Sequence, residues 1–274
     1  MSSRVRVHLS TSGYSYRFWH GKFYPQDLPG WERLSFYARY FTLTELNFSF
    51  YRIPSPSTMR SLRRQAGDGF TFSLKLWRGF THRRSRPPSE EEIEAFLKAC
   101  HALGDGLRFI LAQFAHAYTP GEAEVERIWQ IAETFSPWQV VVELRHREWL
   151  EEGWLDRLPT QVVVAALDLP ELADYLPPVI PRPGPLLYLR LHGRNREAWT
   201  QGGAGKYDYA YKPDELSHWV ELMDQMEELR EAFIFANNTP CALEAVESLR
   251  ELLSEKPRYE LISPRQPLPL GEEG

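Results

Sequence analysis

The sequence predicts a single α/β domain, a (β/α)8 barrel of the TIM type. Eight short stretches of apolar, β-branched or aromatic residues recur along the chain, and most are followed by a helical pattern. Strands that alternate with helices form parallel sheets, and eight repeats are enough to close such a sheet into a barrel. A doubly wound open sheet has the same alternation and remains the alternative. The predicted strands cover residues 5–10, 43–48, 70–76, 108–114, 139–145, 161–168, 186–192 and 232–237.

Four segments between these strands have apolar residues at steps of three and four, which is typical of amphipathic helices. The first begins with Ser89 as an N-cap, followed by three glutamates that interact favourably with the helix dipole. Residues 193–211 are rich in glycine and predict a long mobile loop. From Lys256 onward the chain is rich in proline, so we expect a barrel domain over 1–255 and an extended or disordered tail over 256–274. The predicted helices cover residues 89–103, 121–135, 213–229 and 242–253.

The amino-acid composition limits the classes to which the protein can belong. The chain has 274 residues, of which 43% are hydrophobic, and this supports one large core. The formal net charge of −5 gives no general indication of a nucleic-acid or membrane-surface protein. Cys100 and Cys241 are not at metal-binding or redox spacing, and neither a signal peptide nor a membrane-spanning run is recognisable. We therefore expect a soluble, cytoplasmic protein with no membrane partner.

Charged residues occupy one face of several predicted strands. Because side chains alternate along a strand, Glu143 and Arg145 face away from Val142 and Leu144, and the strand over 186–192 divides in the same way. The apolar face suits packing against helices, so the polar face must point into the barrel. An unpaired charge buried there would cost several kcal/mol, so these groups must pair, meet water or bind a ligand. Barrel enzymes have their sites at this C-terminal end of the strands.

We predict that these polar residues meet at one barrel mouth and form a functional site. The alternative is that they only neutralise one another inside the barrel, as the balance of acids and bases would allow. The loops that follow the strands add aromatic and basic residues, which suit stacking of rings and binding of phosphates or carboxylates. The catalytic candidates are Lys75, Glu143, Asp168 and His192. The substrate-binding candidates are Tyr14, Glu45, Asn47, His82, Gln113, Arg145, Arg190, Asn237 and Asn238.

The chain resembles the YecE-like family, domain of unknown function 72, from about residue 10 to about residue 253. Two departures concern the pocket floor: Gln113 precedes Phe114-Ala115-His116 instead of Leu-Pro-Pro, and Ala236 replaces an aromatic residue. The resemblance implies a TIM-type barrel and a set of signature residues, but no reaction; a likeness to endonuclease-IV-like or xylose-isomerase-like barrels is an analogy of fold. The shared motifs are Thr11-Ser12-Gly13-Tyr14, Glu45-Leu46-Asn47, Phe72-Ser73-Leu74-Lys75, Val142-Glu143-Leu144-Arg145-His146, Arg190-Leu191-His192-Gly193 and Asn237-Asn238-Thr239.

Three functions remain open at this level. The first is an enzyme that acts on a small anionic substrate, sugar-like or phosphorylated. Lys75 and the arginines would bind the anion, Glu143 would be the general base, and His192 would be the acid or proton shuttle. The second is a nucleic-acid-binding or phosphodiester-processing protein that uses the basic loop over 78–86 with Arg194 and Arg196. The third is a barrel that binds a ligand without chemistry.

A metal or cofactor is not expected. Glu45, Glu143, Asp168 and His192 are residue types that ligate divalent ions. No HExxH, CxxC or clustered-histidine spacing occurs, and the nearby lysine and arginines would repel a cation. The sequence contains no indication of the oligomeric state.

Overall fold

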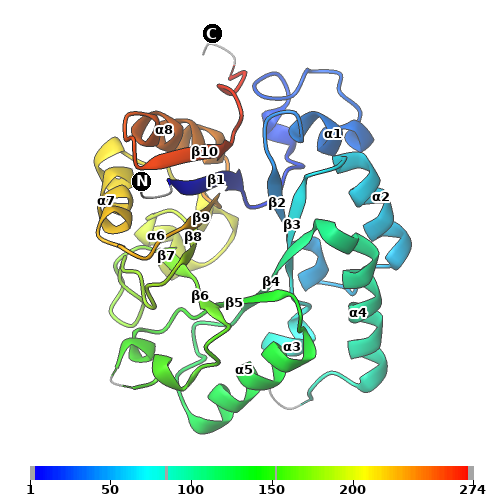
Figure 1. The fold of residues 1–274 in the computed structure, drawn as a ribbon, viewed down its shortest axis with the longest axis vertical. Coiled ribbons are helices and arrows are strands. Elements are labelled where there is room, and N and C mark those ends of the chain that lie inside the picture. Colours follow the sequence, from blue (N-terminus) through cyan, green and yellow to red (C-terminus); the bar gives the residue numbers. More distant parts are fainter. Residues whose placement is uncertain (1–3, 84–85, 152, 271–274) are drawn as a thin grey trace.

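The computed structural model describes residues 4–83, 86–151 and 153–270, and these form an α/β barrel of the TIM type (Figure 1). Its strands all pair in parallel, and helices lie outside them. All eight predicted strands are confirmed, with the sixth divided into two short segments. The strands are β1 (Val5–Thr11), β2 (Leu43–Leu46), β3 (Thr71–Lys75), β4 (Leu107–Gln113), β5 (Gln139–Glu143), β6 (Val163–Val164), β7 (Ala166–Asp168), β8 (Leu186–Leu191), β9 (Glu231–Ala236) and β10 (Tyr259–Ser263).

The hydrogen-bonded ladders form two five-stranded sheets, in the orders β2-β3-β4-β5-β6 and β10-β1-β9-β8-β7. At one junction β6 and β7 follow each other directly, and the intervening Ala165 N–H donates to the Val142 carbonyl at 2.9 Å. At the other junction, side chains connect β1 to β2. Ser10 Oγ donates to the Leu43 carbonyl at 2.7 Å, and Thr44 Oγ1 donates to the Thr11 carbonyl at 3.2 Å. Side-chain bonds thus connect the two sheets where no backbone ladder is found among the described residues.

The strand β10 pairs with the first half of β1, from Val5 opposite Tyr259 to His8 opposite Ser263. Beyond it, the Arg265 N–H donates to the Tyr40 carbonyl at 2.9 Å, so the chain continues toward the segment before β2. The tail predicted from residue 256 is thus extended over 259–263, but it belongs to the barrel sheet, and the predicted boundary at 255 does not separate it from the barrel. The last part of that tail, 271–274, lies outside the described residues.

The four predicted helices are confirmed as α4, α5, α7 and α8, although α7 ends five residues earlier than predicted. Pro56–Ala66 was not predicted as a helix, yet Ser55 caps it and Pro56 occupies its first turn. Among the described residues, none of the helices combines the length and the apolar character needed to cross a bilayer. The helices are α1 (Arg33–Tyr37), α2 (Pro56–Ala66), α3 (Arg78–Thr81), α4 (Glu90–Leu103), α5 (Glu122–Thr134), α6 (Arg196–Gln201), α7 (Pro213–Asp224) and α8 (Ala242–Ser254).

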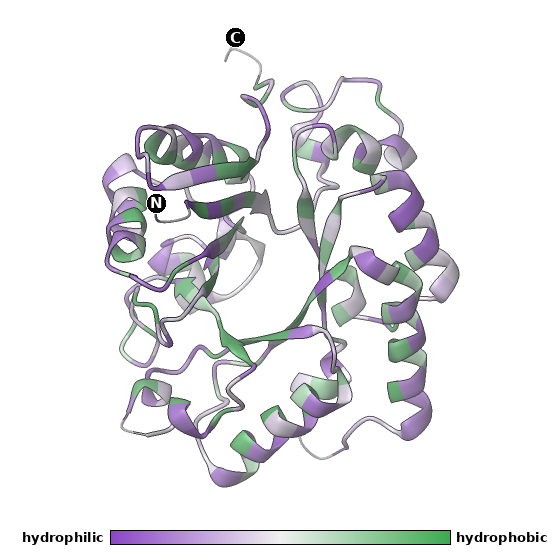
Figure 2. Cartoon of the chain, in the orientation of Figure 1, coloured by the Kyte–Doolittle hydropathy of each residue, from purple (hydrophilic) through white to green (hydrophobic). Residues whose placement is uncertain are grey.

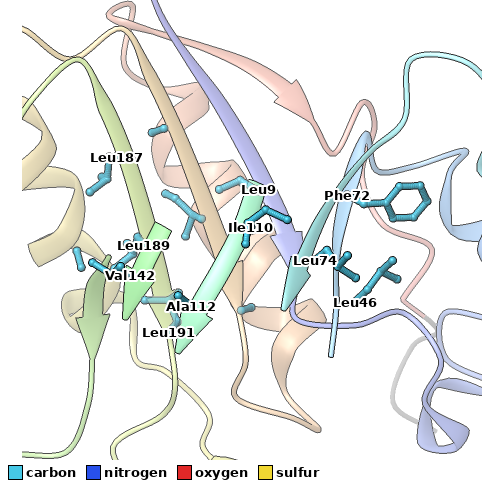
Figure 3. Close-up of a cluster of buried hydrophobic side chains, with 14 of the residues drawn as sticks. Leu9, Leu46, Phe72, Leu74, Ile110, Ala112, Val142, Leu187, Leu189 and Leu191 are labelled. Atoms are coloured by element: carbon cyan, nitrogen blue, oxygen red, sulfur yellow. The ribbon is translucent and has the colours of Figure 1, made fainter. Parts of the chain in front are cut away.

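The alternation of the strands divides the apolar residues into an outer and an inner core. Leu9, Leu46 and Leu189 belong to the outer core between the strands and the helices (Figure 3). Figure 2 shows hydrophobic residues along the strands and on the helix faces that turn toward them. Phe109 and Tyr188 belong to the inner core. The barrel interior is therefore packed, and a site must lie above this core. The inner core also contains Leu43, Leu111, Val141, Ala165, Leu167, Leu169, Leu176, Trp199, Phe233 and Phe235.

Replacing Tyr259 by alanine tests whether the tail is part of the barrel. The Tyr259 side chain is buried, and its hydroxyl donates to Asp224 at 2.7 Å. We expect Tyr259→Ala to lower the free energy of unfolding by about 3 kcal/mol. The control Glu260→Ala, which changes an exposed residue of the same strand, should cost less than about 0.5 kcal/mol. Urea denaturation measures both, and equal stability of the two variants would contradict the assignment of β10 to the barrel.

Candidate functional site

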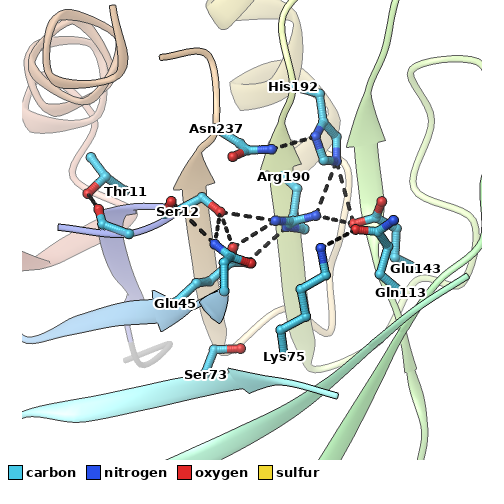
Figure 4. A network of polar contacts seen from close by, with 12 residues as sticks. Thr11, Ser12, Glu45, Ser73, Lys75, Gln113, Glu143, Arg190, His192 and Asn237 are labelled. Atoms are coloured by element: carbon cyan, nitrogen blue, oxygen red, sulfur yellow. Dashed lines mark hydrogen bonds and ion pairs between the residues drawn. The ribbon is translucent and has the colours of Figure 1, made fainter. Parts of the chain in front are cut away.

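Charged side chains gather above the inner core, where the strands end (Figure 4). Lys75, Gln113 and Glu143 are the last residues of the neighbouring strands β3, β4 and β5, and Gln113 and Glu143 are paired in register. Glu45 on β2 and Arg190 on β8 complete a ring around the barrel interior. The predicted meeting of polar strand ends is thus found for these residues, because each lies on the inward face.

Arg190 and Glu45 form a two-pronged ion pair that is shielded from solvent. Arg190 Nε donates to Glu45 Oε1 at 2.9 Å, and Nη2 donates to Oε2 at 2.7 Å. The Tyr188 hydroxyl adds a bond to Oε1 at 2.7 Å, and the Ser12 hydroxyl bonds to Oε2. Burial alone would raise the pKa of Glu45, but Arg190 and these donors lower it below its usual value. Both oxygens of Glu45 are therefore occupied by protein donors.

Glu143 is the second carboxylate of the buried layer and lies between two arginines. Arg145 donates to its Oε1 from Nε at 2.7 Å, and Arg190 Nη1 bonds to its Oε2. Burial raises the pKa of Glu143, but Arg190 and Arg145 outweigh it and hold the pKa well below the ordinary value. A carboxylate that stays ionised this firmly accepts a proton poorly near neutral pH. This argues against the general-base role that the sequence suggested for Glu143 and favours a role as counter-ion.

His192 lies in the same buried layer and has no exposed surface. Asn237 Nδ2 donates to its Nδ1 at 2.8 Å, which leaves the ring proton on Nε2, 3.5 Å from Glu143 Oε2. Burial lowers the pKa of His192 to about 4, although Glu143 opposes the shift. The imidazole is therefore neutral at pH 7 and fixed in one tautomer, which disfavours the acid or shuttle role predicted for it.

Above this layer lies a rim of partly exposed residues, defined here as Asn47, Lys75 and Gln113, together with the buried Arg145. Lys75 Nζ donates to Gln113 Oε1 and lies 4.7 Å from the centre of the Phe50 ring. Within the described ranges no carboxylate forms an ion pair with Lys75, because the arginines occupy those nearby. Burial, reinforced by Arg190, lowers the pKa of Lys75 to about 7. Lys75 is thus a cation without a partner of opposite charge.

Besides Arg145 Nη2, which forms only the ion pair with Glu143, two buried polar atoms at this mouth have no hydrogen-bond partner among the described residues. They are Asn47 Oδ1 and Trp199 Nε1. Trp199 lies in α6, and its ring is 5.5 Å from the Arg145 guanidinium and 6.1 Å from the His192 ring. Buried polar groups are normally satisfied, so unsatisfied ones beside a charged rim are places where a ligand would bond.

Residues 193–211, predicted as a long mobile loop, contain α6 and a 3-10 helix over Ala204–Tyr207. Trp199 and Tyr207 from this segment lie within about 6 Å of His192, so the segment covers the buried layer. Asp168 anchors it, because Arg194 donates twice to the Asp168 carboxylate, at 2.9 and 2.7 Å.

Asp168 itself is a correction to the predicted site. Its neighbour Leu167 packs in the inner core, so Asp168 points outward, toward α7. There it accepts bonds from the Tyr211 hydroxyl at 2.8 Å and from Trp219 Nε1 at 2.6 Å. Its carboxylate shares no hydrogen-bond or ion-pair partner with Glu143 among the described residues. Asp168 is therefore a structural anchor for the covering segment.

Tyr14, His82 and Asn238 are also placed differently from the central candidates. Tyr14 packs near Tyr37 in the outer core, with ring centres 6.2 Å apart. Asn238 is buried, and its amide donates to the Tyr209 and Cys241 carbonyls at 2.9 and 3.1 Å, so it stabilises a turn. His82 is exposed, and its ring lies edge-on to Phe50 at 4.9 Å, which places it beside the rim.

Several supporting residues were not among the predicted site residues. Tyr188 and Ser73 share a hydrogen bond of 2.8 Å beneath Glu45, and Ser12 bonds to both Glu45 and Arg190. The alternation of side chains along a strand places Tyr188 on the same face as Arg190, and Ser73 on the same face as Lys75. The sequence therefore already indicated that both residues face the site. Trp199 carries no such signal, because it lies in a segment without periodicity.

Among the residues predicted to contact nucleic acid, Arg194 is held by other side chains, because it is bound to Asp168 and Glu215. Arg84 and Ser85 of the basic loop lie outside the described residues, whereas Arg78, Arg86 and Arg196 are exposed.

Glu143 and His192 lie side by side, but the four candidate metal ligands do not form one set of ligands. Asp168 is in a separate cluster, and the oxygens of Glu45 and Glu143 are filled by arginine and hydroxyl donors. Over residues 4–83, 86–151 and 153–270, no three His, Cys, Asp or Glu side chains are arranged to hold a metal ion.

The fold and the site define a TIM-type barrel with a buried ion-pair layer at the C-terminal ends of its strands. Residues 8–269 match the family described as protein of unknown function DUF72, and the chain belongs to this family. It is similar to the UPF0759 protein YunF of Bacillus subtilis, with 24% identity over 90% of this chain and 95% of that protein.

Solved structures of the same family have the same fold. A DUF72 family protein from Thermotoga maritima shares 27% identity and has a TM-score of 0.79, covering 91% of this chain and 99% of that one. A DUF72 family protein from Enterococcus faecalis shares 22% identity with a TM-score of 0.74, covering 93% of this chain and 99% of that one. These matches support the barrel and leave the reaction open.

The pH dependence of stability tests the Glu45–Arg190 pair. At neutral pH, Glu45→Gln should lower the free energy of unfolding by about 3 kcal/mol or more, because Arg190 loses a buried partner. The pKa of Glu45 is lower in the folded than in the unfolded protein. The stability that ionised Glu45 contributes is therefore complete above about pH 4.3 and is lost as the pH falls toward the pKa of the folded state. The stability gap between the wild type and Glu45→Gln should therefore narrow in acid. Denaturant titrations between about pH 7 and pH 3 measure it.

The exposed Glu260 is the matched control for that experiment, and Glu260→Gln should change little at any pH. Tyr188→Phe removes one bond to Glu45 at nearly constant volume and should cost about 2 kcal/mol. A gap between the wild type and Glu45→Gln that stays constant with pH would show that Glu45 is not held ionised by Arg190.

Proposed function

We propose that this barrel is an enzyme that acts on a small anionic substrate, phosphorylated or sugar-like, by acid–base chemistry at the C-terminal mouth. One observation carries the proposal. The buried acids are neutralised by arginines, while Lys75 and part of Arg145 keep donors for a ligand. A purely self-neutralised interior would not leave a desolvated cation at a partly exposed rim.

The anion would bind between Lys75 and Arg145. Arg145 donates to Glu143 through Nε, and its Nη1 has no acceptor among the described residues. Lys75 has a single hydrogen-bond acceptor, Gln113 Oε1. A phosphate or carboxylate would supply the negative charge that both cations lack, through charge-assisted bonds. Arg190 is not proposed as a ligand, because its donors are used by Glu45, Glu143 and Ser12.

The proton would be transferred by Lys75. Its pKa of about 7 leaves both the amine and the ammonium well populated near neutral pH, as efficient general acid–base catalysis requires. Glu143 and His192 would act as positioning residues, since each is held in one charge state. Substrate hydroxyls would donate to Asn47 Oδ1, which lacks a protein donor in the described part of the chain. Trp199 and Tyr207 would exclude water from the reacting groups.

Sulfate binding tests the anion site, because sulfate does not change its charge near neutral pH. We expect Arg145→Gln to weaken sulfate binding about tenfold or more, which is about 1.4 kcal/mol. Arg147→Gln makes the same charge change at an exposed neighbour and should change binding less than about twofold. Isothermal titration calorimetry measures both, and equal affinities of the two variants would remove the proposed anion site.

The same site should bind sulfate less well as the pH rises from about 6 to about 8. The pKa of Lys75 is lowered to about 7, so the ammonium is present below this pH and is lost above it. Lys75→Met should remove this pH dependence and also abolish turnover of any substrate that is found. Unchanged affinity across this range in the wild type would contradict the role of Lys75. Binding with no turnover of any sugar phosphate tested would instead favour the non-catalytic barrel.

A further inference from the structure

Lys75 forms no ion pair within the described residues, and its surroundings differ from those of Lys98 and Lys256, which do. Lys98 is 61% exposed and pairs with Glu94 at 2.9 Å, and Lys256 pairs with Asp224. Lys75 instead points into the mouth, with Phe50 on one side and an amide oxygen as its hydrogen-bond acceptor. A lysine in such a place has a neutral amine available as a nucleophile.

The neighbouring charges keep the Lys75 amine from being stabilised as an ammonium. Arg190 lies between Glu45 and Glu143 and donates hydrogen bonds to both carboxylates, and Arg145 donates to the remaining oxygen of Glu143. Lys75 therefore faces two guanidinium groups but no carboxylate with an unused oxygen. Gln113 Oε1 accepts one N–H of Lys75, which orients the amine without neutralising a positive charge.

We propose that Lys75 forms an imine with a substrate that carries an aldehyde or ketone beside its anionic group. This proposal rests on the function proposed above and names the substrate class of the same site. The substrate anion would bind Arg145 and place its carbonyl carbon near Lys75 Nζ. It would also supply the negative charge that the folded chain does not provide to Lys75, which stabilises the positive iminium.

The chemistry needs no oxidant or reductant. The lone pair of Lys75 Nζ attacks the carbonyl carbon, a C–N bond forms, and the carbonyl electron pair moves to oxygen. Transfer of a proton from nitrogen to that oxygen gives a carbinolamine. Protonation of its hydroxyl and loss of water then leave a C=N bond to Nζ. Such an imine acidifies the neighbouring C–H bond, so it serves proton transfers or carbon–carbon bond changes next to the carbonyl.

Reductive trapping tests the imine. The full-length wild-type chain is incubated with sodium cyanoborohydride and either pyruvate, as the carboxylate probe, or glycolaldehyde phosphate, as the phosphate probe. Intact mass and peptide mapping locate the adduct. With at least one probe, we expect modification of Lys75 at least about tenfold faster than of Lys98 in the same molecule, because Lys98 is exposed, lies outside the mouth and is paired with Glu94. The reactive probe identifies which anionic group the site accepts.

Two variants complete the test. Lys75→Arg keeps a positive charge but has no nucleophilic amine, so it should lose the fast adduct and still bind sulfate. Lys98→Arg should leave the adduct at Lys75 unchanged. Modification that is no faster at Lys75 than at Lys98 with either probe overturns the imine. If sulfate binding still depends on Arg145 in that case, the proposed function stands, and if it does not, both proposals fail.

Discussion

The bridge that Arg190 makes between Glu45 and Glu143 is the interaction on which the barrel mouth depends. The buried charges of Glu45, Glu143 and Arg190, from β2, β5 and β8, sum to −1, and Arg145 supplies the fourth charge that makes the set neutral. Removing one partner of such a set leaves an uncompensated charge, which typically costs about 3–5 kcal/mol. The set therefore connects distant strands, including those of the two separate sheets, and orders the top of the barrel.

This bridge also decides what the neighbouring residues can do. Because the arginines occupy the carboxylates, Lys75 is left beside positive charges, and the pKa of its amine falls to about 7. The pKa of His192 falls as well, since burial outweighs the attraction of Glu143. The charges that stabilise the buried layer thus leave Lys75, the proposed reactive group, at the rim. The covering segment, which Asp168 anchors, lies over His192 in the buried layer.

Much of the fold and part of the site could be predicted from the sequence, for a physical reason. The alternation of side chains along a strand is a local property that can be followed in the sequence. It correctly placed Glu45, Glu143 and Arg190 on the inward faces of their strands, where they meet. Asp168 was predicted at the mouth from its place at a strand end, but Leu167 before it faces the inner core, so the same alternation turns Asp168 outward. The alternation could not show how the carboxylates are shared, because partner choice depends on three-dimensional distances. The strand β10 was missed because it is short and flanked by Pro257 and Pro264.

The titration of the Lys75 amine tests the central claim most directly. Lysines labelled with ¹³C at Cε report the charge of each amine by NMR, and Lys98 in the same spectrum serves as the reference. A bridge that withholds both carboxylates from Lys75 gives a titration midpoint of about 7. A midpoint near the ordinary lysine value of about 10.4 would show that Lys75 has a counter-ion and would contradict the account.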